Sequence, residues 1–276
     1  MTPGDYVLGP EEYFRGMSYS DWAVVWSNWL YSDDPDRTDK FDEHMIFFRG
    51  NLDYYKYAAE GDISSLDESK RFYNRTGDQA VTICKGTTIF IPVLTAMYFI
   101  GREYEGMALS NESQLRRAAR KDNDMSGGIW ATIQTPDNGT SEPIVNDLTL
   151  FRAETPKFKL KISDKNPFIQ YILGDSPSGT EEYDAVTDGY FLILKSLPSK
   201  SCRIQFGGKG RNKYRTDAVY DINVADCESP ILVRDISKRD NKNPATWFQD
   251  NSTDIPVHKT PPALHEMPAT ENKKIK

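Results

Sequence analysis

The sequence predicts a mainly β protein, an antiparallel β-sandwich of the jelly-roll type with an N-terminal amphipathic helix and one inserted helix. About eight or nine short apolar or alternating segments are separated by turns rich in glycine, proline and aspartate, as in sandwiches and unlike alternating strand–helix units. Only two segments have helical periodicity. We therefore expect one sandwich domain over 18–236, an N-terminal extension over 1–17 and a C-terminal arm over 237–276.

The composition agrees with a globular protein. Its 276 residues are 38% hydrophobic and 27% charged, with 16 prolines and 18 glycines, which excludes collagen, coiled coils and membrane bundles. The longest apolar stretch, 89–100, is too short to span a bilayer. A net charge of -7 argues against nucleic acid as the partner.

The first predicted helix covers 19–32. Ser18 and Asp21 have the spacing of a capping box. The apolar stripe of this helix is made of Trp22, Trp26, Trp29 and Leu30. Because tryptophans on one helix face usually belong to a core, we interpret them as buried side chains rather than as a sugar-binding platform.

The second predicted helix covers 111–121, with Leu115 and Ala118 facing inward. The other periodic segments predict strands, because they are apolar throughout or alternate strictly. These segments are Met45–Phe48, Ala80–Cys84, Thr88–Val93, Ile129–Ile133, Lys157–Ile162, Tyr190–Leu194, Cys202–Phe206 and Ala218–Val224.

Glycines divide several of these segments. Gly86 predicts a turn between two strands. Gly189, which follows Thr187-Asp188, suits a tight turn into a buried strand. Gly207-Gly208 would let the chain leave a strand with unusual dihedral angles. All of these roles are structural.

Three cysteines, Cys84, Cys202 and Cys227, form no even-numbered disulfide framework. Cys202 and Cys227 flank a predicted hairpin, but a turn near residue 211 places Cys202 opposite roughly residue 220. Bridged Cα atoms lie within about 7 Å of each other. We therefore expect no bridge between this pair.

Residues 237–276 differ in composition from the rest of the chain. Apolar residues are sparse there, and the segment holds Pro244, Pro256, Pro261, Pro262 and Pro268. Such a composition does not form a core of its own. We interpret it as an extended arm that lies on a protein partner, with Trp247 and Phe248 as its apolar anchor.

No motif indicates a reaction. His44 is the only histidine outside the arm, no Gly-x-Ser-x-Gly elbow is present, and no His or Cys spacing fits zinc. The glycine-rich segment 206–211 lacks the lysine-Ser/Thr ending of a phosphate-binding loop. We therefore expect a protein that is not an enzyme.

Calcium is the one candidate cofactor. Asp122, Asp124 and Ser126 occupy the first, third and fifth positions of an EF-type loop. The twelfth position is Ile133 instead of the bidentate glutamate. The alternative interpretation of this segment is a polar turn between a helix and a strand.

The C-terminal half resembles a widespread, uncharacterised and often secreted protein family. Residues 183–191 read YDAVTDGYF and 204–208 read IQFGG, similar to the family pattern "AVSDGYW…L.PLPPGKHTIHFGG". Upstream segments follow in the same order: 20–29 resembles "EWAARWWQW", 46–50 "VWFLAG", 84–94 "C.VPAGKALFFPVLN" and 151–158 "YRVQSPxF". The resemblance implies an extracytoplasmic type of design and carries no activity.

These features favour a non-catalytic structural or assembly protein, a capsid-associated or decoration component of a virion that forms homo- or hetero-oligomers. The N-terminus resembles no signal peptide, so we expect synthesis in the cytoplasm and a location in a virion or extracellular-type particle. One alternative is a surface carbohydrate-binding module, assisted by calcium and using an exposed aromatic side chain such as Trp130. Another is a hydrolase that uses an unrecognised carboxylate pair.

Overall fold

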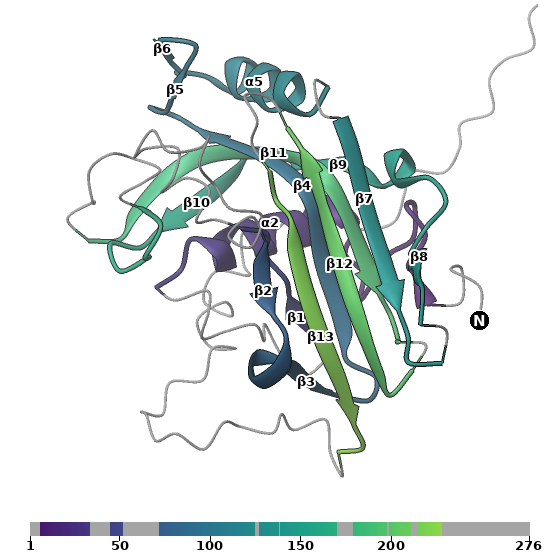
Figure 1. The fold of residues 1–276 in the computed structure, drawn as a ribbon. Helices are drawn as coiled ribbons and strands as arrows, with labels where there is room; N and C mark the ends of the chain where they lie inside the picture. Colours follow the sequence, from purple (N-terminus) through teal and green to yellow (C-terminus); the bar gives the residue numbers. More distant parts are fainter. Residues whose placement is uncertain are drawn as a thin grey trace, which may run out of the picture.

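The computed structural model describes residues 6–33, 45–51, 72–124, 127–137, 139–169, 179–197, 199–210 and 215–227. Within these ranges the predicted fold class is confirmed, because the chain forms a mainly β, sandwich-like structure with two α-helices (Figure 1). The helices are α2 (Tyr19–Leu30) and α5 (Glu112–Asp124). Two single 3-10 turns are η2 (Gly77–Gln79) and η3 (Leu148–Phe151).

The strands form two main sheets and one small hairpin. The first sheet contains β1 (Met45–Phe47), β4 (Thr88–Phe99), β9 (Arg152–Glu154), β10 (Phe158–Ile162) and β11 (Glu181–Leu194). The second sheet contains β2 (Tyr73–Arg75), β3 (Val81–Cys84), β7 (Gly127–Gln134), β8 (Ser141–Pro143), β12 (Ser201–Lys209) and β13 (Ala218–Ala225). The hairpin consists of β5 (Glu103–Tyr104) and β6 (Met107–Ala108).

The strand pairing is mostly antiparallel, with three exceptions. The first sheet has the order β1-β4-β11-β10, with β9 also on β11, and the second has the order β2-β13-β12-β7-β8, with β3 also on β13. The pairs β1–β4, β2–β13 and β3–β13 are parallel. The antiparallel arrangement that the sequence predicts therefore holds except at these three pairs. Parallel neighbours need long connections, which local turn signals do not reveal.

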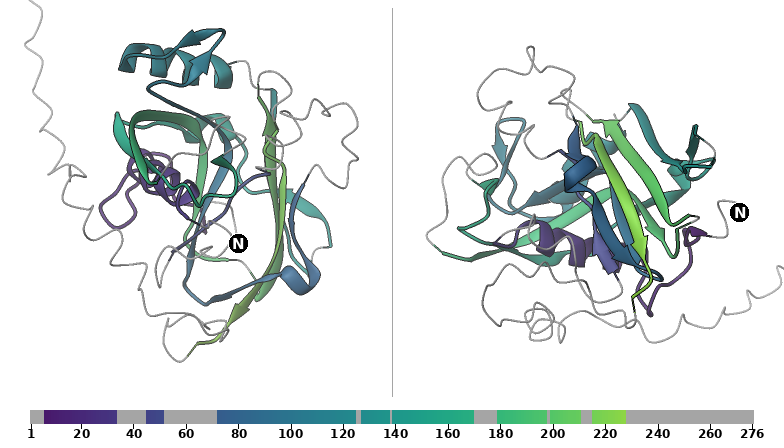
Figure 2. Two further views of the ribbon diagram at one scale, coloured as in Figure 1. Left: turned by 90° about the vertical axis from the view of Figure 1, so that its left-hand side faces the viewer. Right: turned by 60° about the horizontal axis from the view of Figure 1, so that its bottom comes forward.

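The central strands are covered on both faces. Helix α2 lies on one side of the first sheet and the second sheet lies on the other, while α5 crosses the ends of β4 and β11 (Figures 1 and 2). Every β4 side chain except Thr95 is buried. Two-sided coverage explains why this strand has a continuous apolar run instead of an alternating pattern.

Helix α2 forms where the sequence predicts it. The Ser18 backbone N–H donates to the Asp21 carboxylate (2.9 Å), and the Asp21 N–H donates to the Ser18 hydroxyl (3.3 Å), which completes the capping box. All three of its tryptophans are buried. The interpretation of Trp22, Trp26 and Trp29 as core residues is therefore confirmed.

Helix α5 begins one residue after its predicted start and ends later than predicted. Asn111 caps it by accepting a hydrogen bond from the Gln114 N–H (3.0 Å). The helix continues to Asp124, three residues beyond 121. Its inner residues Leu115, Ala118 and Ala119 join a small separate core with Ala96, Tyr98 and Val186 of the first sheet.

The N-terminal residues belong to the domain. Tyr6, Val7 and Leu8 are each at most 5% exposed and form part of the main core. Val7 pairs with Leu194 at the end of β11. The predicted boundary, which made 1–17 an extension outside the sandwich, was therefore wrong for these residues.

Two glycine predictions were also wrong. Gly189 lies inside β11, and Gly207 and Gly208 lie inside β12, so none of them forms a turn. At each of these positions another segment of the chain lies so close that a Cβ atom would have little room. A Cβ atom at Gly189 would lie 2.9 Å from the Leu94 carbonyl oxygen, and one at Gly207 would lie 2.3 Å from a carboxylate oxygen of Asp217.

We expect Gly207→Ala to lower the free energy of unfolding by roughly 1–3 kcal/mol, because overpacking forces the backbone of β12 or β13 to move. Urea unfolding measures this change. Gly127→Ala is the matched control, because a Cβ atom there meets nothing within 4 Å. Equal stabilities for the two variants would contradict the close approach of Asp217.

Candidate functional site

The predicted calcium ligands Asp122 and Asp124 lie in the last turn of α5, so the predicted loop does not begin at Asp122. Asp122 accepts hydrogen bonds from the hydroxyls of Tyr98 (2.5 Å) and Tyr104 (3.0 Å). Asp124 accepts one from the Arg152 guanidinium (2.6 Å). The two carboxylates thus face different protein donors and are not brought together. The third predicted ligand, Ser126, lies outside the described residues, and calcium binding stays a prediction.

No group of three or more His, Cys, Asp or Glu side chains suited to a metal ion was found in the described ranges. His44, the arm 237–276 and its anchor residues Trp247 and Phe248 lie outside them. No helix within these ranges is long and apolar enough to cross a membrane.

A charged network joins α5 to the first sheet. Arg152 on β9 holds the buried carboxylate of Asp188 with two hydrogen bonds, of 2.9 and 2.6 Å. Asp188 is only 1% exposed, so the carboxylate of this bidentate pair is removed from water. Asn123 of α5 donates to the Asp188 carbonyl (2.6 Å). The end of the helix is therefore fastened to the middle of β11.

A second part of this network lies nearer the start of α5. Arg116 binds Glu112 on its own helix and Glu154 on β9. Arg120 also binds Glu154 (2.5 Å). One carboxylate on the sheet thus holds two arginines on successive turns of the helix.

The outer face of α5 is hollowed. An open hollow of about 780 Å³ is lined by Glu112, Ser113, Arg116, Arg117, Arg120, Lys121 and Asp124. Glu154 accepts from two of its arginines, and Glu105 pairs with Lys121 at 2.8 Å. Three of its four cationic side chains, Arg116, Arg120 and Lys121, are paired with carboxylates, so we interpret the surface as an electrostatic clamp between α5 and the sheet rather than as an anion-binding site.

The pKa of Glu154 reflects its contacts with Arg116 and Arg120. Burial favours the neutral acid, but hydrogen bonds and charges from Arg120 and Arg116 outweigh it and hold the pKa of Glu154 below its ordinary value. A carboxylate with a lowered folded-state pKa stabilises the fold above its unfolded pKa, and this stability is lost as the pH falls through the folded pKa.

We therefore expect Glu154→Gln to lower the free energy of unfolding at pH 7, by roughly 1.5–3 kcal/mol, the range for hydrogen bonds to a charged group. The difference from the wild type should shrink as the pH falls below about 4. Urea unfolding at pH 7 and pH 3.5 tests both statements. Glu103→Gln, the same change on an exposed residue of β5, is the control. A difference that stays constant with pH would contradict the clamp.

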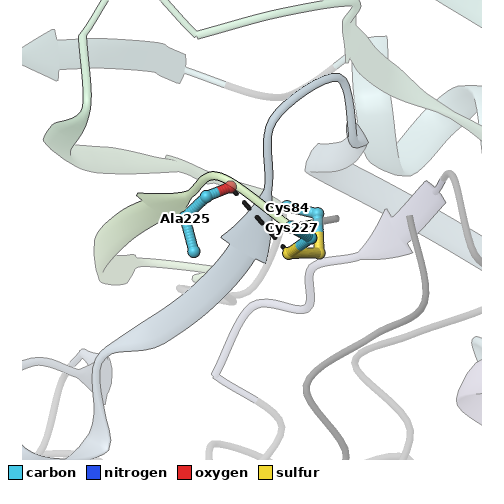
Figure 3. Close-up of a disulfide and its surroundings, with 3 residues drawn as sticks. All are labelled: Cys84, Ala225 and Cys227. Carbon is cyan, nitrogen blue, oxygen red and sulfur yellow. Dashed lines mark hydrogen bonds between the residues drawn. A yellow bond between two sulfur atoms is a disulfide. The ribbon is translucent and has the colours of Figure 1, made fainter. Parts of the chain in front are cut away.

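Cys84 and Cys227 form a disulfide, with Cα atoms 5.5 Å apart (Figure 3). Strand β3 lies parallel to β13, and its last residue, Cys84, is paired with Ala225. The Lys85 N–H donates to the Ala225 carbonyl (2.9 Å) just past this pair. The disulfide therefore adds a covalent link at the end of the hydrogen bonds between β3 and β13. This pair was not predicted from the sequence, where only a bridge between Cys202 and Cys227 was considered.

The hairpin argument against a Cys202–Cys227 bridge is confirmed, although its register was wrong by two residues. Cys202 pairs with Ile222. Its thiol is free and buried. Burial and the charge of Asp221 raise the pKa of Cys202 to about 12. This thiol therefore stays protonated at neutral pH and is a poor nucleophile.

Trp130, the aromatic residue named for a carbohydrate site, is half-buried on β7. Its ring meets that of Phe72 edge-on, at a centroid distance of 6.4 Å. The ring is thus partly used in packing.

Sequence reasoning missed Arg152, Asp188, Glu154 and the Cys84–Cys227 pair. Arg152 and Glu154 lie close together in the chain, but Asp188 and the α5 arginines are far from them in sequence. The only signs of this network in the sequence were the charged residues Arg152 and Glu154 at the two ends of β9 and the charged residue Asp188 inside an apolar strand. Comparisons with protein-family models, with curated proteins and with solved structures gave no match, so the family resemblance stays a prediction.

Proposed function

We propose that this chain is a non-catalytic structural protein of a virion or extracellular-type particle, which assembles with protein partners through its Pro-rich segment 237–276. The observation that carries the proposal is the Cys84–Cys227 disulfide. It binds the end of β13, the last described strand, to the turn that connects β3 with β4.

The position of this bridge suits a protein that is held by its C-terminal segment. A neighbour bound to that segment would pull on β13 at its C-terminal end. Without a covalent link, the pull would separate β13 from β3 one hydrogen bond at a time. The bridge at Cys227 passes the load to Cys84 and so to β4, the buried central strand of the first sheet.

The chemistry of the bridge also favours a particle outside the reducing cytosol. Structural disulfides persist in secreted proteins and at virion and cell surfaces, and they are rare where thiols are kept reduced. A chain made in the cytoplasm would close the bridge after release or in an oxidising compartment.

Size-exclusion chromatography with light scattering tests the proposal on the full chain. We expect an oligomer whose size depends on 237–276. A chain ending at residue 236 retains every described residue and should be a folded monomer. The double variant Trp247→Ala/Phe248→Ala should weaken assembly without changing the thermal unfolding of the sandwich. A full-length chain that stays monomeric at high concentration under oxidising conditions would refute the assembly role.

A further inference from the structure

No described helix or strand covers the outer face of the second sheet. Strands β7, β12 and β13 lie toward the viewer in Figure 1, with the first sheet behind them, and the left view of Figure 2 shows the same layers from the side. Side chains alternate between the two faces of a strand. Ile133, Ile204 and Tyr220 belong to the core, so the residues next to them in these strands point outward.

The outward side chains form rows across the strands, and most of them are polar. The first row, in the order of pairing from β7 to β2, is Thr132, Gln205, Val219 and Asn74. The second row is Gln134, Arg203 and Asp221. Neighbouring strands lie about 4.8 Å apart, so the four-strand row is roughly 14 Å long. A ligand on this face therefore meets several side chains at once.

The centre of the first row has hydrogen-bonding groups that the described fold does not use. Thr132 and Gln205 are cross-strand neighbours, and both are partly exposed. Neither side chain is hydrogen-bonded to another described residue. A hydroxyl and a carboxamide can each both donate and accept. Together they suit a ligand whose own groups do the same, such as a polyhydroxylated one.

The charges on this face are paired within the protein. Arg203 donates two hydrogen bonds to Asp221, of 2.6 and 3.0 Å. Asp217, whose carboxylate lies against Gly207 of β12, is paired with Arg215 (2.6 Å). The chain as a whole carries a net charge of -7, which disfavours an anionic ligand. Paired charges in an acidic protein thus fit an uncharged partner best.

An aromatic ring lies at one end of the face. Trp130 precedes Thr132 by two residues on β7 and points to the same side. It is half-buried, and its contact with Phe72 is edge-on, at a centroid distance of 6.4 Å. Aromatic rings pack against apolar groups, while the indole N–H can donate a hydrogen bond. A sugar offers both surfaces, because its ring carries C–H groups as well as hydroxyls.

We propose that the outer face of the second sheet, centred on Thr132 and Gln205, binds an uncharged oligosaccharide, with Trp130 packed against one sugar ring. This function is separate from assembly through 237–276, and it would attach an assembled particle to a glycan-coated surface. A protein partner fits this face less well, because the centres of protein interfaces are built from several large apolar or aromatic side chains.

Binding of defined oligosaccharides to the full-length protein tests the proposal. An array carries neutral oligomers of glucose, galactose, mannose and N-acetylglucosamine, together with heparin and sialylated glycans as the acidic set. We expect binding to at least one neutral oligomer and none to the acidic set. Titration calorimetry with that oligomer should show binding about tenfold weaker for Thr132→Val/Gln205→Ala, which removes two hydrogen-bonding groups. Trp130→Ala should also weaken it.

Gln114→Ala is the matched control, because it makes the same change on an exposed residue of α5, and it should bind as the wild type does. Thermal unfolding checks that each variant is folded. The proposal is overturned if no neutral oligomer binds, or if Thr132→Val/Gln205→Ala binds as well as the wild type. If that variant instead changes the size of the oligomer in light scattering and no sugar binds, the face contacts protein and the glycan site is refuted.

Discussion

Removing the Cys84–Cys227 bridge is expected to lower the free energy of unfolding by roughly 3–5 kcal/mol. The bridged residues are 143 positions apart in sequence, so the link excludes a large part of the conformations open to the unfolded chain. The double variant Cys84→Ser/Cys227→Ser should unfold at a correspondingly lower urea concentration. The wild type with a reducing agent should behave in the same way.

Cys202→Ala is the control for this experiment, because Cys202 is buried and makes no bridge. Its loss of stability should be the same with and without reductant. If the double serine variant and the wild type unfold together under oxidising conditions, the bridge contributes nothing to stability. The bridge would then not strengthen the hold of β13 on the sandwich, as the proposed function requires, although the fold would be unchanged.

Trp26→Ala is expected to lower the free energy of unfolding by about 3–5 kcal/mol, as for other large aromatic residues removed from a core. The side chain is 3% exposed. Its ring packs against Phe90 and Phe191 at centroid distances of 6.4 and 6.3 Å. Its indole N–H donates to the Phe48 carbonyl (2.9 Å). The substitution therefore leaves a cavity between α2 and the first sheet and removes one buried hydrogen bond.

Chemical denaturation of Trp26→Ala and Trp26→Phe separates these contributions. The phenylalanine variant keeps most of the ring packing and should lose only about 1–3 kcal/mol, the range for a buried acceptor left without its donor. Tyr13→Ala is the matched surface control, because Tyr13 is 62% exposed, and it should change stability by less than about 0.5 kcal/mol. A Trp26→Ala protein as stable as Tyr13→Ala would show that α2 does not cover the first sheet.

Both experiments probe parts of the molecule that the proposed assembly needs. The disulfide holds the end of β13, and Trp26 holds α2 against β4 and β11, the strands on which the rest of the first sheet is built. Loss of the bridge should weaken an assembly held through 237–276 more than loss of an equally stabilising core contact. Light scattering on the two variants, at a temperature where both stay folded, makes that comparison.

Sequence reasoning was most successful where structure depends on neighbouring residues. The capping box of Ser18 and Asp21 and the tryptophan stripe determine α2 locally, and the alternation of 157–162 predicts β10. The antiparallel pairing of β12 and β13 follows from two alternating segments joined by a short connection. In each case, side chains a few residues apart carry the whole signal.

The glycines show where such reasoning fails. A glycine in sequence indicates either a turn or a close approach by another part of the chain. Gly189 and Gly207 are of the second kind, since their neighbours are Leu94 on β4 and Asp217 beside β13. The sequence contains no local mark that distinguishes these two cases, because the approaching atoms come from distant segments.

By itself, the sequence determined the mainly β class, both helices, most strand positions and the buried role of the helical tryptophans. The tertiary structure alone decided the parallel additions of β1, β2 and β3, the Cys84–Cys227 bridge, the clamp on α5 and the place of residues 6–8 on β11. The first group depends on backbone preference and periodicity within one segment. The second depends on which distant segments pack together, because long-range pairing is selected by burial of the whole core.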